Sequence, residues 1–318
     1  MADTKLILGE CLTELKKLNG ESVNCCVTSP PYWALRDYGV DGQLGLEHTF
    51  QEYIDKLCDI FDEVKRVLKK DGTCWVNLGD TYGGSGKGAG GYSNKSTLQG
   101  YTGEHTKGRT MAKENWNFKK APKTENDVSK SLCQIPSRFS IEMCNRGWIL
   151  RNEIIWHKPN SMPSSVKDRF TVDFEKLFLF VKNKKYWFET QREPHQTEEW
   201  KTRNMSKRKK NDSNKQYQKH SHGPQYYHPE GRNKRTVWEI NTKPYKGAHF
   251  AVFPEELIKT PIKAGCPKGG IVLDPFCGSG TTGVVAKKQG KEFIGIELNP
   301  EYIEMAKQRI ANTQESMF

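Results

Sequence analysis

Long apolar runs, paired cysteine motifs and a phosphate-binding P-loop are all missing from this sequence. No apolar stretch approaches the about 18 residues that a membrane-spanning helix needs, so we expect no membrane association. The nine cysteines have neither metal-ligand nor disulfide spacing, which favours a reduced, intracellular protein without a bound metal. Without Gly-x-x-x-x-Gly-Lys-Ser/Thr, a P-loop nucleoside triphosphatase is disfavoured. Residues 1–3 stand too close to the predicted strand at residues 5–8 for a signal peptide, so we expect a cytoplasmic protein.

Positive charge, by contrast, is abundant. The chain of 318 residues carries 50 Lys and Arg against 38 Asp and Glu, a formal net charge of +12. An excess of this kind is typical of proteins with an acidic macromolecular partner. The length accommodates one large α/β domain, or one domain with a sizeable insertion.

Alternating strand and helix patterns indicate a parallel α/β sheet. Apolar residues recur with a period of 3.6 over residues 49–70, which predicts a helix that ends at Asp71-Gly72. The short connection after residue 157 predicts a locally antiparallel pair. Strands are expected at residues 5–8, 23–27, 73–78, 148–157, 175–181 and 292–297, with another beginning at Ile271.

Two segments interrupt this alternation. Residues 83–126 form a long Gly-rich stretch, which we interpret either as a clamp on a nucleic acid or as disorder. Residues 184–245 are rich in Lys and Arg interleaved with Tyr and His, which is typical of a nucleic-acid contact but also of a solvated linker. The candidate contacts with phosphates are Lys207, Arg208, Lys209, Lys210, Arg232, Lys234 and Arg235.

The hexapeptide Thr-Ser-Pro-Pro-Tyr-Trp at 28–33 follows the predicted strand 23–27. Two prolines cannot continue a ladder, so they place a rigid turn at the carboxyl end of the strand, where open α/β sheets bind ligands. This turn presents a hydroxyl, carbonyls without competing amides and two aromatic rings. A planar amino-bearing group could stack on the rings and bond to Ser29 and the Pro30 carbonyl; an ordinary Pro-Pro loop is the plainer interpretation.

A second candidate ligand-binding turn lies near the end of the chain. Asp274 ends a predicted strand, glycines follow at Gly278, Gly280 and Gly283, and Glu297 ends the next strand. Glycines let backbone amides approach a nucleotide-type ligand, and a terminal acid can accept hydrogen bonds from ribose hydroxyls. A tight turn or a dinucleotide-binding enzyme would also explain this pattern.

Together, Asp-Pro-Phe-Cys-Gly-Ser-Gly-Thr-Thr at 274–282 and the hexapeptide at 28–33 resemble the amino-group DNA methyltransferases that use S-adenosyl-L-methionine. Their order, with the catalytic motif first, resembles the β class. Further segments at residues 72–80, 153–159, 249–257 and 294–302 are similar to family motifs. The resemblance implies a circularly permuted Rossmann-like class I methyltransferase sheet, mostly parallel with one antiparallel strand, carrying an inserted target-recognition region.

The resemblance also divides the chain and assigns roles. It implies a catalytic part at residues 1–183, a target-recognition insertion at 184–245 and a cofactor-binding part at 246–318. The implied catalytic residues are Ser29, Pro30, Pro31 and Tyr32. Those implied to surround the cofactor are Glu10, Phe250, Phe253, Pro254, Asp274, Phe276, Gly278, Ser279, Gly280, Thr281, Thr282 and Glu297, although Glu10 could equally be a structural or exposed acid.

The implied reaction is methylation of an exocyclic amino group in double-stranded DNA. Ser at position 29 resembles the cytosine-N4 enzymes, with adenine-N6 as the alternative. Methylation at carbon 5 is disfavoured because the sequence contains no Pro-Cys dipeptide. An RNA or protein methyltransferase, a Rossmann oxidoreductase and a non-catalytic nucleic-acid-binding protein remain as alternatives. A homodimer and a cognate restriction endonuclease stay open as partners.

Overall fold

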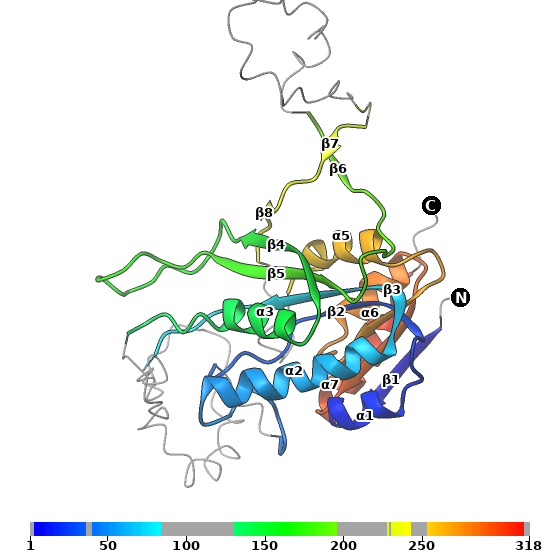
Figure 1. Ribbon diagram of the computed structural model, residues 1–318, viewed down its shortest axis with the longest axis horizontal. Helices are drawn as coiled ribbons and strands as arrows, with labels where there is room; N and C mark the ends of the chain where they lie inside the picture. Colours follow the sequence, from blue (N-terminus) through cyan, green and yellow to red (C-terminus); the bar gives the residue numbers. More distant parts are fainter. Residues whose placement is uncertain are drawn as a thin grey trace, which may run out of the picture. The chain divides into compact units, whose positions relative to one another are not determined.

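The computed structural model describes residues 3–35, 40–83, 130–195, 228, 230–242 and 253–314 (Figure 1). Four expected sites, Lys207 to Lys210, lie outside the described residues, as do Phe250 and most of the Gly-rich stretch. The chain divides into two compact units, one formed by Met1–Phe188 with Thr236–Phe318 and the other by Glu189–Arg235.

An eight-stranded sheet runs through the larger unit in the order β1-β10-β9-β2-β3-β5-β4-β8. Of these strands only β5 is antiparallel to its neighbours, as the sequence predicted. The strands are β1 (Thr4–Leu8), β2 (Val23–Thr28), β3 (Leu68–Leu78), β4 (Ile149–His157), β5 (Phe174–Val181), β8 (Val237–Glu239), β9 (Ile271–Asp274) and β10 (Glu292–Glu297).

The permuted order is visible in the middle of the sheet. Strands β9 and β10 come last in the chain, yet they lie between β1 and β2. The final helix packs against β1, so the two ends of the described chain are neighbours (Figure 1). This arrangement confirms the permuted, mostly parallel sheet expected from the sequence.

Helices cover both faces of the sheet, and alternate strand residues contact different helices because side chains alternate across a strand. Cys26, Cys74 and Phe180 belong to the core under α1, α2 and α3, whereas Trp75 and Leu179 belong to the core under α5, α6 and α7. The helices are α1 (Cys11–Lys17), α2 (Phe50–Val67), α3 (Ile135–Asn145), α5 (Glu255–Gly265), α6 (Thr281–Lys288) and α7 (Pro300–Ala311).

Helix α2 begins and ends for identifiable reasons. Thr49 and Glu52 form a capping box at its start. The expected end at Asp71-Gly72 is wrong, because the helix stops at Val67 and β3 begins at Leu68. Leu68 is fully buried and pairs with Val23 of β2, so sheet pairing overrides the local Asp-Gly signal.

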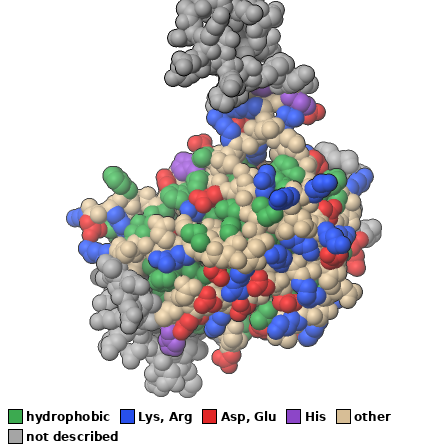
Figure 2. Space-filling model, in the orientation of Figure 1, with side chains coloured by type: hydrophobic (Ala, Val, Ile, Leu, Met, Phe, Trp, Pro, Cys, Tyr) green, Lys and Arg blue, Asp and Glu red, His purple; other side chains and the backbone are tan. Residues whose placement is uncertain are grey.

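The smaller unit contains the short antiparallel pair β6 (Arg192–Glu193) and β7 (Arg232–Asn233). Arg232 and Arg235 both donate to Glu193 Oε1, at 2.8 and 2.9 Å. On the face of the molecule shown in Figure 2, acidic and basic side chains of the described residues are interleaved. Residues 237–239, which the sequence placed in the insertion, are a strand of the main sheet.

Candidate active site

The two motif turns leave the sheet side by side. Strands β2 and β9 are parallel neighbours, with Cys25 opposite Val272 and Cys26 opposite Leu273. Both strands therefore end at the same edge, followed by the Ser-Pro-Pro-Tyr turn and the Gly-rich turn respectively. Thr28 Oγ1 donates a hydrogen bond of 2.6 Å to Asp274 Oδ1, which joins the ends of the two strands directly.

The Asp274 side chain is buried between the ends of the two strands. Its side chain is 1% exposed, and it accepts hydrogen bonds from Thr28, from Thr282 Oγ1 at 2.6 Å and from the Phe276 amide at 3.1 Å. Burial raises the pKa of Asp274 to about 6, although the three hydrogen bonds oppose the rise. Its carboxylate therefore holds the two turns together, and its expected place beside the cofactor stays a prediction.

The glycines shape the turn after β9. Gly278 has φ 52° and Gly280 has φ 80°, a left-handed conformation that glycine adopts without strain. In this conformation the Gly278 amide donates to Glu297 Oε2 at 2.7 Å. The Asn299 amide donates to Glu297 Oε1 at 2.9 Å, so the carboxylate is held from both sides at the end of β10.

Glu297 fits a vicinal diol of the kind found in ribose. It is half-buried, and burial raises its pKa in spite of the backbone hydrogen bonds. Each of its oxygens accepts one backbone amide and has a second lone pair with which to accept a hydroxyl. The donor and acceptor chemistry of this turn therefore suits an adenosine-type ligand. Phe276 is partly exposed beside it, on the turn itself.

Three hydroxyl residues of the same motif have inward-facing side chains. Ser279, Thr281 and Thr282 are at most 4% exposed. Arg309 Nη1 donates to Ser279 O and Oγ, both at 2.7 Å, and lies 3.2 Å from Thr281 Oγ1. Ser279 and Thr281 thus tie the turn to Arg309 of α7, whereas Thr282 Oγ1 donates to Asp274 Oδ2. Their expected place around the cofactor stays a prediction.

The Ser-Pro-Pro-Tyr turn is anchored at and beside its prolines. Tyr53 Oη donates to the Pro31 carbonyl at 2.8 Å, and Pro30 is buried. Trp33, expected to offer a second ring to the ligand, is only 7% exposed and donates to Glu47 O at 3.0 Å. The expectation of two presented rings is therefore wrong, because Trp33 packs into the core and leaves only Tyr32 at the site.

Tyr32 is held by residues that the sequence did not identify. Its hydroxyl donates to Glu175 Oε2 at 2.7 Å, and Lys158 Nζ donates to the other oxygen of Glu175 at 2.7 Å. Asn77 Oδ1 lies 3.2 Å from the Tyr32 hydroxyl and 3.4 Å from Ser29 Oγ. Burial and the Glu175 charge raise the pKa of Tyr32 well above its usual value, so the phenol stays neutral.

Local sequence signals for this network were weak. Asn77 and Lys158 lie in the segments 72–80 and 153–159, which resemble family motifs, but nothing in their spacing assigned a role to either residue. Glu175 stands 143 positions from Tyr32, and only the pairing of β3 with β5 brings them together.

Glu10 lies at the expected edge but has a different role. The carboxylate caps α1 by accepting from the amides of Leu12 and Thr13, both at 2.8 Å, and from the Thr13 hydroxyl at 2.7 Å. Burial acts to raise the pKa of Glu10, but these hydrogen bonds lower it below its usual value. The carboxylate therefore has the structural role that the sequence left open for it, and its expected place near the cofactor stays a prediction. Its neighbour Gly9 donates to Glu297 O at 2.9 Å, so the turn borders the candidate cofactor site.

The remaining expected positions are only partly described. Pro254 is the buried N-cap residue of α5, and Phe253 is half-buried against the core under α5 to α7. No cluster of His, Cys, Asp or Glu among the described residues has the arrangement of a metal site. Within the same part of the chain, no helix is long and apolar enough to cross a membrane.

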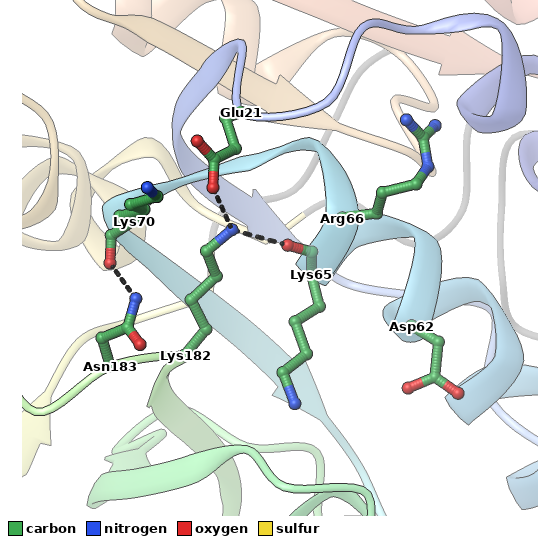
Figure 3. Close-up of a pocket in the computed structure, with 7 residues that line it drawn as sticks. All are labelled: Glu21, Asp62, Lys65, Arg66, Lys70, Lys182 and Asn183. Carbon is green, nitrogen blue, oxygen red and sulfur yellow. Dashed lines mark hydrogen bonds and ion pairs between the residues drawn. The ribbon is translucent and has the colours of Figure 1, made fainter.

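A hollow of about 560 Å³ lies away from these turns (Figure 3). Two of the cations that line it donate hydrogen bonds to carbonyls at helix ends. Lys182 Nζ donates to Lys65 O and Leu68 O at the end of α2. Arg66 donates to Leu15 O and Leu18 O at the end of α1. In Figure 3, Lys182 also reaches Glu21, while the Lys65 ammonium points away from it. Cations at helix carboxyl ends complement the helix dipole, so we interpret this hollow as a structural junction.

Comparisons with known proteins agree with this geometry. Residues 23–308 match the N6/N4 methyltransferase family, described as DNA methylase. The chain is 41% identical over 306 residues to the Type II methyltransferase M.Cfr9I of Citrobacter freundii, covering 96% of this chain and 87% of that protein.

Solved structures share the fold. The PvuII DNA methyltransferase (cytosine-N4-specific) superposes with a TM-score of 0.60 at 19% identity, covering 97% of this chain and 86% of that one. The putative DNA modification methylase TTHA0409 from Thermus thermophilus, complexed with S-adenosyl-L-methionine, gives a TM-score of 0.57 at 21% identity, covering 99% of both chains.

Proposed function

This chain belongs to the N6/N4 family of DNA methylases, and we propose that it transfers a methyl group from S-adenosyl-L-methionine to the N4 amino group of cytosine at a specific site in double-stranded DNA. Family membership confirms the amino DNA methyltransferase expected from the sequence. Cytosine is supported by Ser29 and by the stated specificity of the PvuII enzyme. The Type II relatives support a restriction-modification setting with a cognate endonuclease.

One observation carries the proposal: the Thr28–Asp274 hydrogen bond holds the catalytic turn and the Gly-rich turn at one sheet edge. A methyl donor held by one turn and a base held by the other would then meet at that edge. Much of the acceleration in such a reaction comes from orientation, because a bimolecular encounter becomes an effectively unimolecular one.

S-adenosylmethionine, when bound, supplies an electrophilic methyl group. The Gly-rich turn and Glu297 would hold it through main-chain amides and a carboxylate. Ser29 Oγ and the Pro30 carbonyl would each accept a hydrogen bond from one N–H of the base amine. These hydrogen bonds orient the amino nitrogen and draw its lone pair out of the ring, which makes the nitrogen a better nucleophile.

Tyr32 would form the wall on which the base stacks. Glu175 fixes its hydroxyl, and an ideal Cβ on Gly79 would lie only 2.5 Å from ring atom Cε2, so the Gly79 backbone closely borders the ring. The target must leave the duplex to reach this wall. Neutral Tyr32 also keeps a second negative charge away from the site.

Target recognition would fall to the insertion at residues 184–245. Its support is the run of basic side chains and the separate compact unit at Glu189–Arg235. Basic side chains contribute affinity through phosphates, while base edges determine specificity. If the assignment is right, exchanging the insertion between related enzymes moves the methylated sequence; unchanged specificity refutes it.

The product itself tests the proposed reaction. Duplex DNA treated with the enzyme and labelled S-adenosylmethionine is digested to nucleosides, and the modified nucleoside is identified by mass. We expect N4-methylcytosine from the wild type and a loss of at least about 100-fold in rate for Ser29→Ala, since a positioned polar group is worth about 10²–10³. N6-methyladenine would replace the cytosine assignment, and methylation confined to RNA or protein would overturn the proposal.

A further inference from the structure

The connection between β4 and β5 is a mainly polar segment that carries four exposed apolar side chains. Phe170 is 96% exposed and Met162 is 81% exposed, and Val166 and Val172 are also exposed. Clustered apolar side chains in solvent usually mark a surface that contacts another molecule. On this part of the surface, Figure 2 shows hydrophobic side chains projecting among charged ones of both signs.

This connection leaves the sheet at the catalytic edge. His157 at the end of β4 pairs with Phe174 at the start of β5. Lys158, the first residue of the connection, binds Glu175, and Glu175 in turn accepts from Tyr32. Two side-chain contacts therefore connect the start of this segment to the ring on which the target base would stack.

The residues before Phe170 are fixed by contacts, while the Phe170 ring itself is exposed to solvent. The guanidinium of Arg169 lies 3.4 Å from the centroid of the Tyr82 ring, and Asp168 forms an ion pair of 2.7 Å with Lys130. The Lys158 amide closes the base of the connection on Asp173 O at 2.7 Å. The residues before Phe170 are thus tethered while its own ring contacts almost nothing.

Charge favours a nucleic acid as the occupant of this surface. Lys167 and Arg169 lie beside the apolar side chains, and the carboxylate of Asp168 between them is paired with Lys130, which leaves the two cations in excess. Cations beside an apolar wedge suit a duplex, because phosphates attract the cations while base steps accept the apolar group.

We propose that Phe170 inserts into the base stack of the duplex and fills the space left when the target base turns into the Ser29 and Tyr32 site. This inference rests on the proposed function. Extruding a base loses the free energy of its stacking and pairing in the duplex. An aromatic side chain inserted in the duplex recovers part of the lost stacking. Phe170 should therefore affect the rate only when the target base is paired at the start.

The experiment compares Phe170→Ala with wild type on two duplexes carrying the methylation site, once that site is identified. One duplex is fully paired, and the other has an abasic position opposite the target base. On the paired duplex we expect the kcat/KM of the variant to fall by about 10-fold or more, in line with the cost of extrusion. On the abasic duplex it should return to within about two-fold of wild type, because the target is already unpaired.

Ile141→Ala is the matched control, since Ile141 is an exposed apolar residue of α3, 62% exposed, outside this connection. It should leave both rates unchanged. Equal rates for Phe170→Ala and wild type on the paired duplex would overturn the inference, as would equal losses on both duplexes. Failure of the wild type to methylate either duplex would instead refute the proposed function.

Discussion

Thr28 and Asp274 stand 246 positions apart in the chain, yet a hydrogen bond of 2.6 Å joins their side chains at the carboxyl ends of β2 and β9. Both side chains are at most 1% exposed. A buried carboxylate is costly unless it is hydrogen-bonded, so this contact has a structural reason to persist. It also aligns the turn that would hold the base with the turn that would hold the methyl donor.

Replacing Thr28 should therefore affect both stability and rate. Thr28→Val removes the hydroxyl, keeps the shape and leaves Asp274 one buried donor short, which costs about 1–3 kcal/mol of unfolding free energy. Urea unfolding measures the loss. Thr28→Ser keeps the donor and should lose much less; equal losses for the two variants would show that the hydrogen bond is not the cause.

The raised pKa of Asp274 predicts a pH dependence. Burial raises the pKa from 3.8 unfolded to about 6 folded, so between these values the folded protein binds more protons than the unfolded chain. The contribution of protonated Asp274 to the free energy of unfolding is therefore lost as pH rises from about 4 to about 6. For a shift of this size the loss is on the order of 3 kcal/mol.

Asp274→Asn tests this directly. The variant cannot titrate at this position, so the fall in unfolding free energy between pH 4 and pH 6 should be smaller than in wild type. Chemical unfolding across that range gives the comparison. Parallel pH profiles for the two proteins would contradict a titrating Asp274, whatever the absolute stability of the variant.

Glu175 should act as a positioning residue through Tyr32. Tyr32→Phe keeps the ring but removes its hydrogen bond to Glu175, and we expect kcat to fall by about 3–10-fold, the equivalent of one net hydrogen bond, with the KM for S-adenosylmethionine unchanged. Steady-state kinetics separate the two constants. A change confined to KM would point to a role in ligand binding instead.

Gly283 should not accept a side chain. An ideal Cβ there would lie 2.4 Å from Ile310 Cδ1 and 2.7 Å from Phe293 Cδ1, where α6 meets α7 and β10. Gly283→Ala is expected to cost about 1–3 kcal/mol through overpacking. Gly20→Ala is the control, because the nearest neighbour of its Cβ would be 3.6 Å away. Similar midpoints of thermal unfolding for both variants would refute the packing argument.

Much of the candidate site could be predicted because its signals are local. The prolines at 30 and 31 end β2, and Gly278 and Gly280 take up left-handed conformations after β9, as their residue types favour. The end of α2 could not be predicted in the same way. There the pairing of Leu68 with Val23 outweighs an Asp-Gly signal three residues later.

By itself the sequence determined most strands of the main sheet, the helix over residues 50–67, the permuted order of the motifs and the two turns, because proline, glycine and apolar periodicity act over a few residues. Only the tertiary structure decided which hydrogen-bond partners the side chains of the candidate site have. Asp274, Ser279 and Thr282 turn inward, Glu10 caps a helix, and Glu175 reaches Tyr32. These outcomes depend on which strands become neighbours and on where a buried polar group finds its hydrogen-bond partner, and spacing along the chain specifies neither.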